Sequence, residues 1–204
     1  MPFLTGAMSF REYKVEGAYP PNYRKAFEDG LARYAFRAPQ PARGETRAAG
    51  WANPRRLLDP DLTFPALLID DYLFAALRVD RLALNPRLFK ARLAERMAAK
   101  SRELGRKRLA RADRDALADV LKREMLAETS PTTSVYEWVW HLEGRRVFFA
   151  SAGEKLNAEF SDLFEECFNL ALTPLFTYFR ALDWAQAHGK TEALDVVAPS
   201  GGML

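Results

Sequence analysis

The chain has 204 residues, of which 49% are hydrophobic and 12% aromatic, with one cysteine and a formal net charge of +3. This composition predicts a globular protein of one or two domains with a substantial core. It excludes an intrachain disulfide, and no apolar run approaches the roughly 18 residues of a membrane span. Residues 1–10 lack the features of a secretory signal, so we expect a cytoplasmic protein.

The N-terminal part of the chain is predicted to contain two strands and one helix. Residues 7–15 alternate loosely between polar and apolar and indicate a strand. The helix that follows carries apolar residues at helical spacing, namely Phe27, Leu31 and Tyr34. Residues 38–60 contain four prolines and predict a loop anchored by Trp51. Residues 71–79 predict the second strand.

The segment 86–114 begins as an amphipathic helix and keeps its positive charge after its apolar stripe has ended. The stripe consists of Phe89, Leu93, Met97 and Leu104. Beyond Met97 the same face also carries Lys100, Lys107 and Arg111, which cannot be buried without partners. We therefore expect the first half of the helix to pack on the body of the protein and the second half to project into water.

The charge of this basic helix is its second notable feature. Between Arg87 and Arg114 there are eleven Lys and Arg residues against three acidic ones, which makes the segment +8. A projecting cationic arm on a nearly neutral protein indicates a polyanionic partner. A solvated helix face with no partner is the alternative interpretation, and charge alone does not separate the two.

A second helix is predicted after a break near Arg111, with Asp113 as its N-cap. Its apolar stripe consists of Leu117, Val120, Leu121 and Met125. The helix ends before Pro131. Two helices joined by a short connection form an αα-hairpin, in which the basic arm is one leg.

The clearest β-hairpin lies at residues 135–150, where two alternating segments flank a turn at Glu143-Gly144. Three aromatic residues share one face of it: Tyr136, Trp138 and Trp140. Such rings could stack on nucleic-acid bases, but we favour a core position for the two tryptophans.

The C-terminal part is predicted to begin with a helix that follows Ser151 and Glu154, which have the spacing of a capping box. Its core-facing stripe consists of Leu156, Phe160, Leu163, Phe164, Cys167 and Phe168. The aromatic segment 175–184 is expected to pack on the body, and residues 198–204 to form a frayed tail.

These elements predict an α+β fold, with an antiparallel sheet, packed helices, and a projecting basic helical hairpin inserted between strands. The expected organisation is a body of residues 1–84 and 132–190, a tip of residues 85–131, and a flexible tail of residues 191–204.

Catalytic chemistry has few candidates in this chain. The carboxylates that could hold a metal ion are Asp59, Asp61, Asp70, Asp71, Glu165 and Glu166. Adjacent residues of a regular strand point to opposite faces, so Asp70 and Asp71 cannot both face one ion. His141 lies beside Glu143 but no nucleophile is linked to it by a motif, and a surface histidine is the favoured interpretation. We expect no catalytic residue, no metal and no cofactor, and keep a metal-dependent nuclease as the least favoured alternative.

The order and spacing of several segments resemble the recombination-associated protein RdgC family over residues 7–184. The segments are the strand at residues 7–15, Ala49-Gly50-Trp51, residues 73–79, Asn85-Pro86 with the basic helix, residues 113–117, the hairpin 138–146, and Ala150-Ser151-Ala152. The resemblance implies a non-catalytic, sequence-independent DNA-binding protein that restrains RecA-driven recombination. It also implies curved protomers that pair into a ring around duplex DNA through a helical tip and a separate base.

The chain departs from that family at two places. The family's C-terminal third has no counterpart after about residue 189, and residues 126–129 replace the aromatic segment at the end of the tip. We therefore expect a monomer or an open dimer, with double-stranded DNA as the partner and indirect antagonism of RecA, and no contact with a membrane.

The expected DNA contacts lie on the basic arm, and we expect the protein to associate with the nucleoid. They are Arg92 and Arg96 near the body, then Lys100, Arg102, Arg106, Lys107, Arg108 and Arg111. Contacts to phosphates carry no sequence information, so binding is expected to be non-specific. An interaction module whose basic arm docks on an acidic protein surface remains the alternative.

Overall fold

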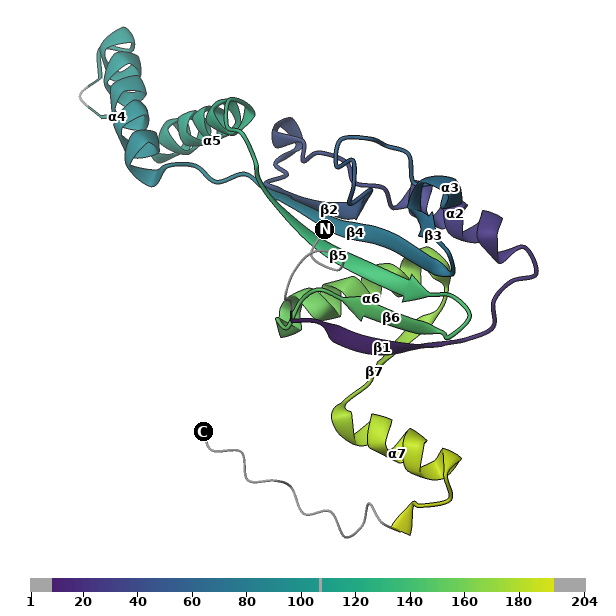
Figure 1. The fold of residues 1–204 in the computed structure, drawn as a ribbon. Helices are drawn as coiled ribbons and strands as arrows, with labels where there is room; N and C mark the ends of the chain where they lie inside the picture. The colour runs from purple at the N-terminus through teal and green to yellow at the C-terminus, as the bar shows by residue number, and fades with distance from the viewer. Residues whose placement is uncertain (1–8, 107, 193–204) are drawn as a thin grey trace. The chain divides into compact units, whose positions relative to one another are not determined.

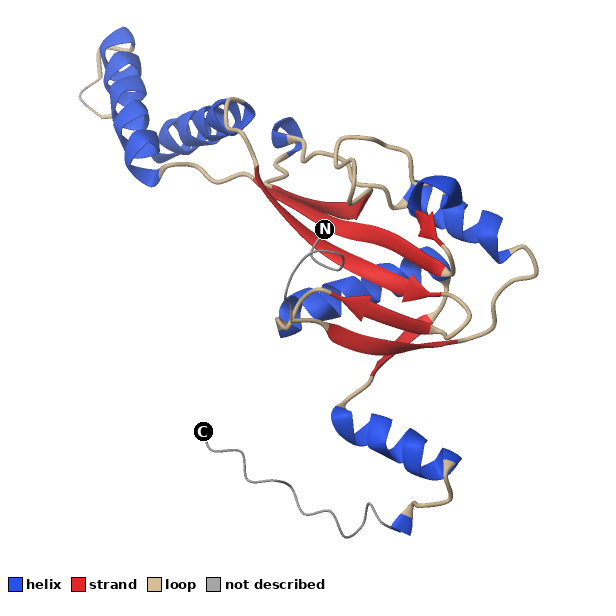
Figure 2. Cartoon of the chain, in the orientation of Figure 1, coloured by secondary structure: helices blue, strands red, loops and turns tan. Residues whose placement is uncertain are grey.

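The computed structural model describes residues 9–106 and 108–192 (Figure 1). Its elements, in chain order, are β1 (Arg11–Glu16), α2 (Tyr23–Arg33), the short 3₁₀ helix η1 (Pro41–Arg43), β2 (Arg47–Ala52), α3 (Phe64–Leu67), β3 (Leu68–Ile69), β4 (Tyr72–Arg81), α4 (Pro86–Glu103), α5 (Arg111–Ala127), β5 (Thr132–His141), β6 (Arg146–Phe149), α6 (Glu154–Phe168), β7 (Ala171–Pro174) and α7 (Thr177–Ala187). Helices and antiparallel strand pairs make the predicted α+β fold, with the helical hairpin α4–α5 inserted between β4 and β5 (Figure 2).

The chain divides into two compact units, and β4 and β5 each contribute residues to both. The first unit comprises Met1–Tyr34, Asn53–Ala76 and Tyr136–Leu204, and the second comprises Ala35–Ala52 and Leu77–Val135. The strand order is β2-β4-β5-β6-β1-β7, with β3 paired to β4. The second unit therefore holds the α4–α5 hairpin together with β2 and η1.

The core of the first unit lies between α6 and the sheet face formed by β5, β6 and β1 (Figure 1). The β5–β6 hairpin is confirmed, with Trp138 opposite Phe149 in antiparallel register. Trp138 and Trp140 are both 0% exposed, which confirms that the tryptophan pair belongs to the core. The rings of Phe149 and Phe160 stack with centroids 4.0 Å apart, so the aromatic stripe of α6 is what fills this layer.

Helix α2 approaches α6 closely because Gly30 has no side chain. Phe27 and Leu31 are buried on either side of it, as their spacing predicted. A Cβ atom on Gly30 would lie 2.4 Å from the carbonyl oxygen of Cys167 and 3.1 Å from its sulfur atom. Cys167 is itself buried, which confirms its predicted core position.

We expect Gly30→Ala to lower the free energy of unfolding by about 2 kcal/mol, because displacing backbone costs more than the roughly 1 kcal/mol of helix propensity that alanine gains. Urea denaturation measures the change. Gly153→Ala is the control, since its new Cβ would meet only the Ser151 hydroxyl at 3.7 Å. The control should cost under about 1 kcal/mol. A Gly30→Ala protein as stable as the wild type would contradict this account of the helix contact.

The prediction of a loop over residues 38–60 is wrong, because this segment contains η1 and the strand β2. The four prolines lie outside Arg47–Ala52, so they flank the strand and do not interrupt it. Trp51 is a buried residue of β2, and its carbonyl accepts a 2.8 Å hydrogen bond from the backbone N–H of Phe36. Gly50 permits this close approach, since a Cβ there would lie 2.6 Å from the Cα of Phe36.

Both predicted helix caps are also wrong. The N-cap of α5 is Ala110, and Asp113 lies in the first turn of the helix. The N-cap of α6 is Gly153, whose N–H donates to the Ser151 hydroxyl at 3.2 Å. Each helix begins two or three residues away from the expected position, so the side chains predicted to cap these helices do not lie at the N-cap position.

The aromatic segment 175–184 does not bury the side chains at its two ends. Phe176 and Trp184 are both more than half exposed, contrary to the expected packing. The Trp184 ring stacks on His188 with a centroid distance of 4.4 Å. The side chains of residues 177–180 and 183, the start of the first predicted strand at residues 7–8, and the predicted tail at 198–204 lie outside the described residues.

Candidate nucleic-acid interface

Helix α4 has a well-defined start and lies at the surface along its whole length. The Asn85 side chain accepts hydrogen bonds from the backbone N–H groups of Arg87 (3.0 Å) and Leu88 (3.2 Å), which caps the helix. Pro86 occupies its first position, where no N–H is needed. None of its 18 residues is buried. The expectation that its first half packs on a body is therefore wrong.

Helix α5 provides the packing surface for α4. The stripe residues Phe89, Leu93 and Met97 are only partly buried, because a single helix covers less surface than a layered core. The buried side chains of α5 are those of Leu121, Met125 and Leu126. Two of these were predicted, Leu121 and Met125, whereas Val120 is exposed.

Two of the eight expected DNA contacts instead join the two helices of the hairpin. Arg92 pairs with Glu128 at 3.2 Å, and Arg96 pairs with Glu124 at 2.5 Å. The hydrogen bond from Arg96 lowers the pKa of Glu124 and raises the pKa of the arginine. These guanidinium groups already have an anionic partner, so their first role in this structure is to connect α4 with α5.

The other expected contacts differ in how strongly they are engaged. Lys100 pairs with Glu103 at 3.0 Å, and Arg111 approaches Asp115 at 3.6 Å. The Nε atom of Arg102 donates weakly to the carbonyl of Ala98, at 3.4 Å. Arg106 and Arg108 are exposed and form no ion pair with a residue of the described chain. Lys107 lies outside the described residues.

Further cations of the hairpin were not selected from the sequence although they are equally exposed. Those without an ion pair to any described residue are Arg87, Lys90, Arg114, Lys122 and Arg123. Lys122 and Arg123 also line a shallow hollow of about 330 Å³ against η1, together with Arg43. The sequence could have identified three of these residues, because Arg87, Lys90 and Arg114 were already counted in the +8 charge of the segment.

The charge of the protein is divided unequally along the chain. Residues 86–128, which span the hairpin, carry thirteen basic and seven acidic side chains, a net charge of +6. The remaining residues are therefore −3, although the whole chain is +3. Even after its internal ion pairs are counted, the hairpin is the cationic part of this molecule, and it can attract polyanions.

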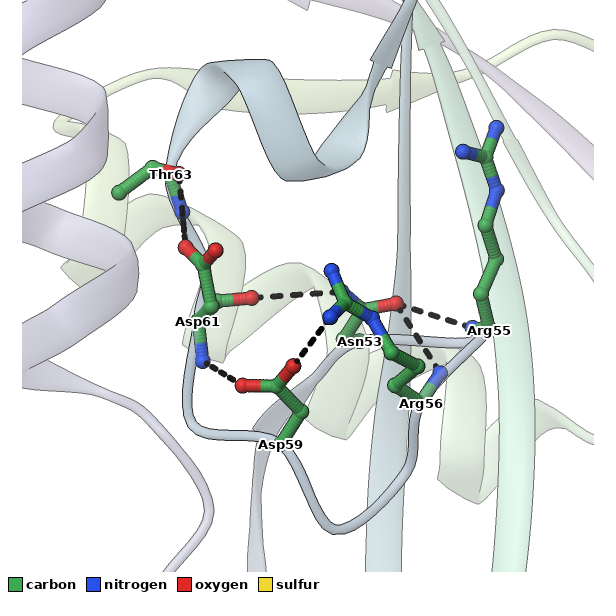
Figure 3. A network of polar contacts seen from close by, with 6 residues as sticks. All are labelled: Asn53, Arg55, Arg56, Asp59, Asp61 and Thr63. Atoms are coloured by element: carbon green, nitrogen blue, oxygen red, sulfur yellow. Dashed lines mark hydrogen bonds and ion pairs between the residues drawn. The ribbon is translucent and has the colours of Figure 1, made fainter.

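The acidic residues near 59–61 serve the loop that contains them (Figure 3). The Asp59 carboxylate accepts a 2.9 Å hydrogen bond from the N–H of Asp61 and pairs with Arg56 at 2.9 Å. The Asp61 carboxylate accepts from the hydroxyl of Thr63 at 2.7 Å, which lowers the pKa of Asp61. Among the described residues, no three His, Cys, Asp or Glu side chains are grouped so that they could hold a metal ion.

The organising residue of this loop is Asn53, which sequence reasoning did not identify. Its side chain is buried and accepts hydrogen bonds from the N–H groups of Arg55 (3.0 Å) and Arg56 (3.3 Å). Its amide nitrogen donates to the carbonyl of Asp61 at 3.3 Å, which closes the loop from the other side (Figure 3). An asparagine followed by a proline is a turn signal that could have indicated this role.

The remaining candidates for chemistry are also placed by the structure. Asp70 has a positive φ of 50° and lies with Asp71 in the turn between β3 and β4, so neither belongs to a regular strand. His141 is partly buried and stacks on Tyr72 with a centroid distance of 4.6 Å, which differs from the expected surface histidine.

No protein-family model and no curated protein matches this chain. Within residues 9–106 and 108–192, no helix combines the length and the hydropathy needed to cross a bilayer.

Proposed function

We propose that the α4–α5 hairpin binds double-stranded DNA without sequence preference. The observation that carries the proposal is a set of exposed cationic side chains that no described carboxylate neutralises. The set, called the free cations below, consists of Arg87, Lys90, Arg102, Arg106, Arg108, Arg114, Lys122 and Arg123. Duplex DNA has a phosphate charge about every 1.7 Å along its axis, so an extended cationic surface finds partners in any sequence.

The free cations suit phosphates better than they suit base edges. Flexible side chains on an exposed helix contact the backbone of the duplex, and such contacts set affinity and orientation. The proposal assigns no catalytic step to the protein. The resemblance to the RdgC family supports a role at the nucleoid, where the protein would restrain RecA-dependent recombination indirectly by occupying duplex DNA.

Binding to two unrelated duplexes of equal length, titrated at several salt concentrations, tests the proposal. If about four to six phosphates are neutralised, log affinity should fall against log salt with a slope of about −4 to −5. Both duplexes should bind alike, since phosphate contacts are shared by all sequences. A flat salt response, or a strong preference for one duplex, would contradict the proposal.

A charge-matched pair of variants locates the binding surface within the same experiment. Changing Arg102, Arg106 and Arg108 together to Ala should reduce the salt slope by about 3 and weaken binding at least about ten-fold. The control changes Arg33, Arg55 and Lys155 to Ala, which removes the same charge from exposed positions of the first unit. Equal losses in both variants would assign the binding to overall charge.

A second candidate is supported by the apolar side chains that lie among the cations. Leu88, Leu104 and Val120 are each more than 40% exposed on the hairpin. A protein surface that is both acidic and apolar would cover these side chains, whereas phosphates would not. If the hairpin binds such a protein, an excess of duplex DNA should not displace that protein from the hairpin. A competition experiment with duplex DNA therefore separates the two candidates.

A further inference from the structure

The hairpin contains a cavity where the end of α4 meets the beginning of α5. Its volume is about 400 Å³, and it is lined by Met97, Ala98, Ser101, Arg108, Leu109 and Arg114. This volume falls in the range of small-molecule sites, which bury a ligand of moderate size. All six lining residues belong to the second unit.

The wall of the cavity is fixed by hydrogen bonds within the connection between the helices. The Ser101 hydroxyl donates to the carbonyl of Arg106, whose own N–H donates to the carbonyl of Ser101 at 3.0 Å. Gly105 has a positive φ of 62°, which lets the chain reverse at the end of α4. Residues 104–106 are thereby folded back on the end of α4, where Ser101 lines the cavity.

Two cationic side chains line the cavity. They are Arg108 and Arg114, and neither forms an ion pair with a described residue. Two guanidinium groups without a carboxylate are well suited to a group with two negative charges. The N-cap Ala110 has no side chain that could cap α5, so the positive end of this helix dipole adds to the same field.

Apolar side chains also line the cavity. Leu109 is only 8% exposed, and Met97 is partly buried beside it. An inorganic anion would leave this surface uncovered, whereas a ligand with a flat or apolar part would cover it. The lining therefore selects a molecule that is charged at one end and apolar at the other.

We propose that this cavity binds a phosphate monoester attached to an aromatic or apolar group, of which a nucleoside monophosphate is the representative. A phosphate monoester carries about −1.5 to −2 charges and three acceptor oxygens at neutral pH, which two guanidinium groups can satisfy. The attached ring lies over Met97 and Leu109. Arg108 and Arg114 also belong to the free cations, but binding of the monophosphate is measured without DNA, so the two proposals are tested separately.

Calorimetric titration with adenosine 5′-monophosphate, inorganic phosphate and adenosine tests the site. The monophosphate should bind with a stoichiometry of one, and each of the other two at least about ten-fold more weakly, because each lacks one half of the contacts. Equal binding of monophosphate and inorganic phosphate, or no binding of the monophosphate, would overturn the proposal.

Two variants that each lose a single positive charge show whether the cavity is responsible. Arg114→Gln should weaken binding of the monophosphate at least about ten-fold, whereas Lys155→Gln, on the exposed surface of α6 in the first unit, should change it less than about two-fold. Equal weakening by both variants would overturn the proposed location. Duplex binding of the unmodified protein keeps the two questions apart: a protein that binds the monophosphate but no duplex refutes only the proposed function, and one that binds duplex but no monophosphate refutes only this site.

Discussion

Replacing Trp140 by alanine is expected to lower the free energy of unfolding of the first unit by about 3 to 5 kcal/mol. The Trp140 side chain is 0% exposed, and its removal leaves a cavity that the surrounding rings cannot fill. Those rings, with their centroid distances, are Tyr19 (5.7 Å), Phe27 (4.9 Å), Phe164 (5.0 Å) and Phe168 (5.2 Å). Chemical denaturation followed by circular dichroism measures the loss.

Trp184→Ala is the matched control for this substitution. Its ring is 54% exposed, so truncation should cost under about 1 kcal/mol. Duplex affinity measured under conditions where the Trp140→Ala protein is still folded should equal that of the wild type, because a buried ring cannot stack on a base. Similar small stability losses in both variants would mean that the aromatic core is not packed as described.

The second large effect is expected at Asp80, the buried carboxylate of β4. Its side chain is 1% exposed and accepts two hydrogen bonds from Arg78 on the same face of the strand, at 3.0 and 2.8 Å. The guanidinium group of Arg78 lies 4.0 Å from the ring centroid of Phe36. Asp80→Ala leaves a largely buried guanidinium group without this carboxylate, and we expect a loss of about 3 kcal/mol.

Stability should also depend on pH through this carboxylate. The hydrogen bond from Arg78 lowers the pKa of Asp80 in the folded protein. The stabilisation is therefore complete above the pKa of the unfolded chain, about 3.9, and is lost as the pH falls through the lower folded pKa. Urea midpoints measured from about pH 7 downwards should fall less steeply for Asp80→Asn than for the wild type.

A surface carboxylate provides the control for the pH series. Asp115 is well exposed and lies 3.6 Å from Arg111, so Asp115→Asn should change the free energy of unfolding by less than about 1 kcal/mol throughout the series. If Asp80→Asn shows the same acid-side slope as the wild type, the Arg78–Asp80 pair does not contribute to stability in the way proposed.

The elements predicted correctly from the sequence are those whose own side-chain pattern determines their structure. The aromatic stripe of α6 and the alternation in β5 are of this kind, and both were found where expected. By contrast, β2 and the four-residue β7 are short, and they are strands because a neighbouring strand lies beside them. Such partners are distant in the sequence, so local periodicity could not reveal these two strands.

The candidate interface shows the same division between local and distant information. The basic composition of the hairpin could be counted directly from the chain. The sequence could not show which cations already have an ion-pair partner, because Glu124 and Glu128 on α5 pair with Arg96 and Arg92 on α4. The sequence therefore predicted the positive charge of the hairpin, while the contacts selected from it included two arginines whose partners lie on the other helix.

These two inter-helix pairs also change what a salt titration counts. A phosphate that arrives at Arg96 displaces the carboxylate of Glu124, an anion that stays attached to the protein. This exchange releases no dissolved ion, and the steep salt dependence of DNA binding arises from ions released into solution. The slope therefore reports the cations that were solvated before binding and omits those already neutralised within the hairpin. For this hairpin, the number of phosphate contacts seen in a complex with DNA therefore differs from the number of charges derived from the salt dependence of binding.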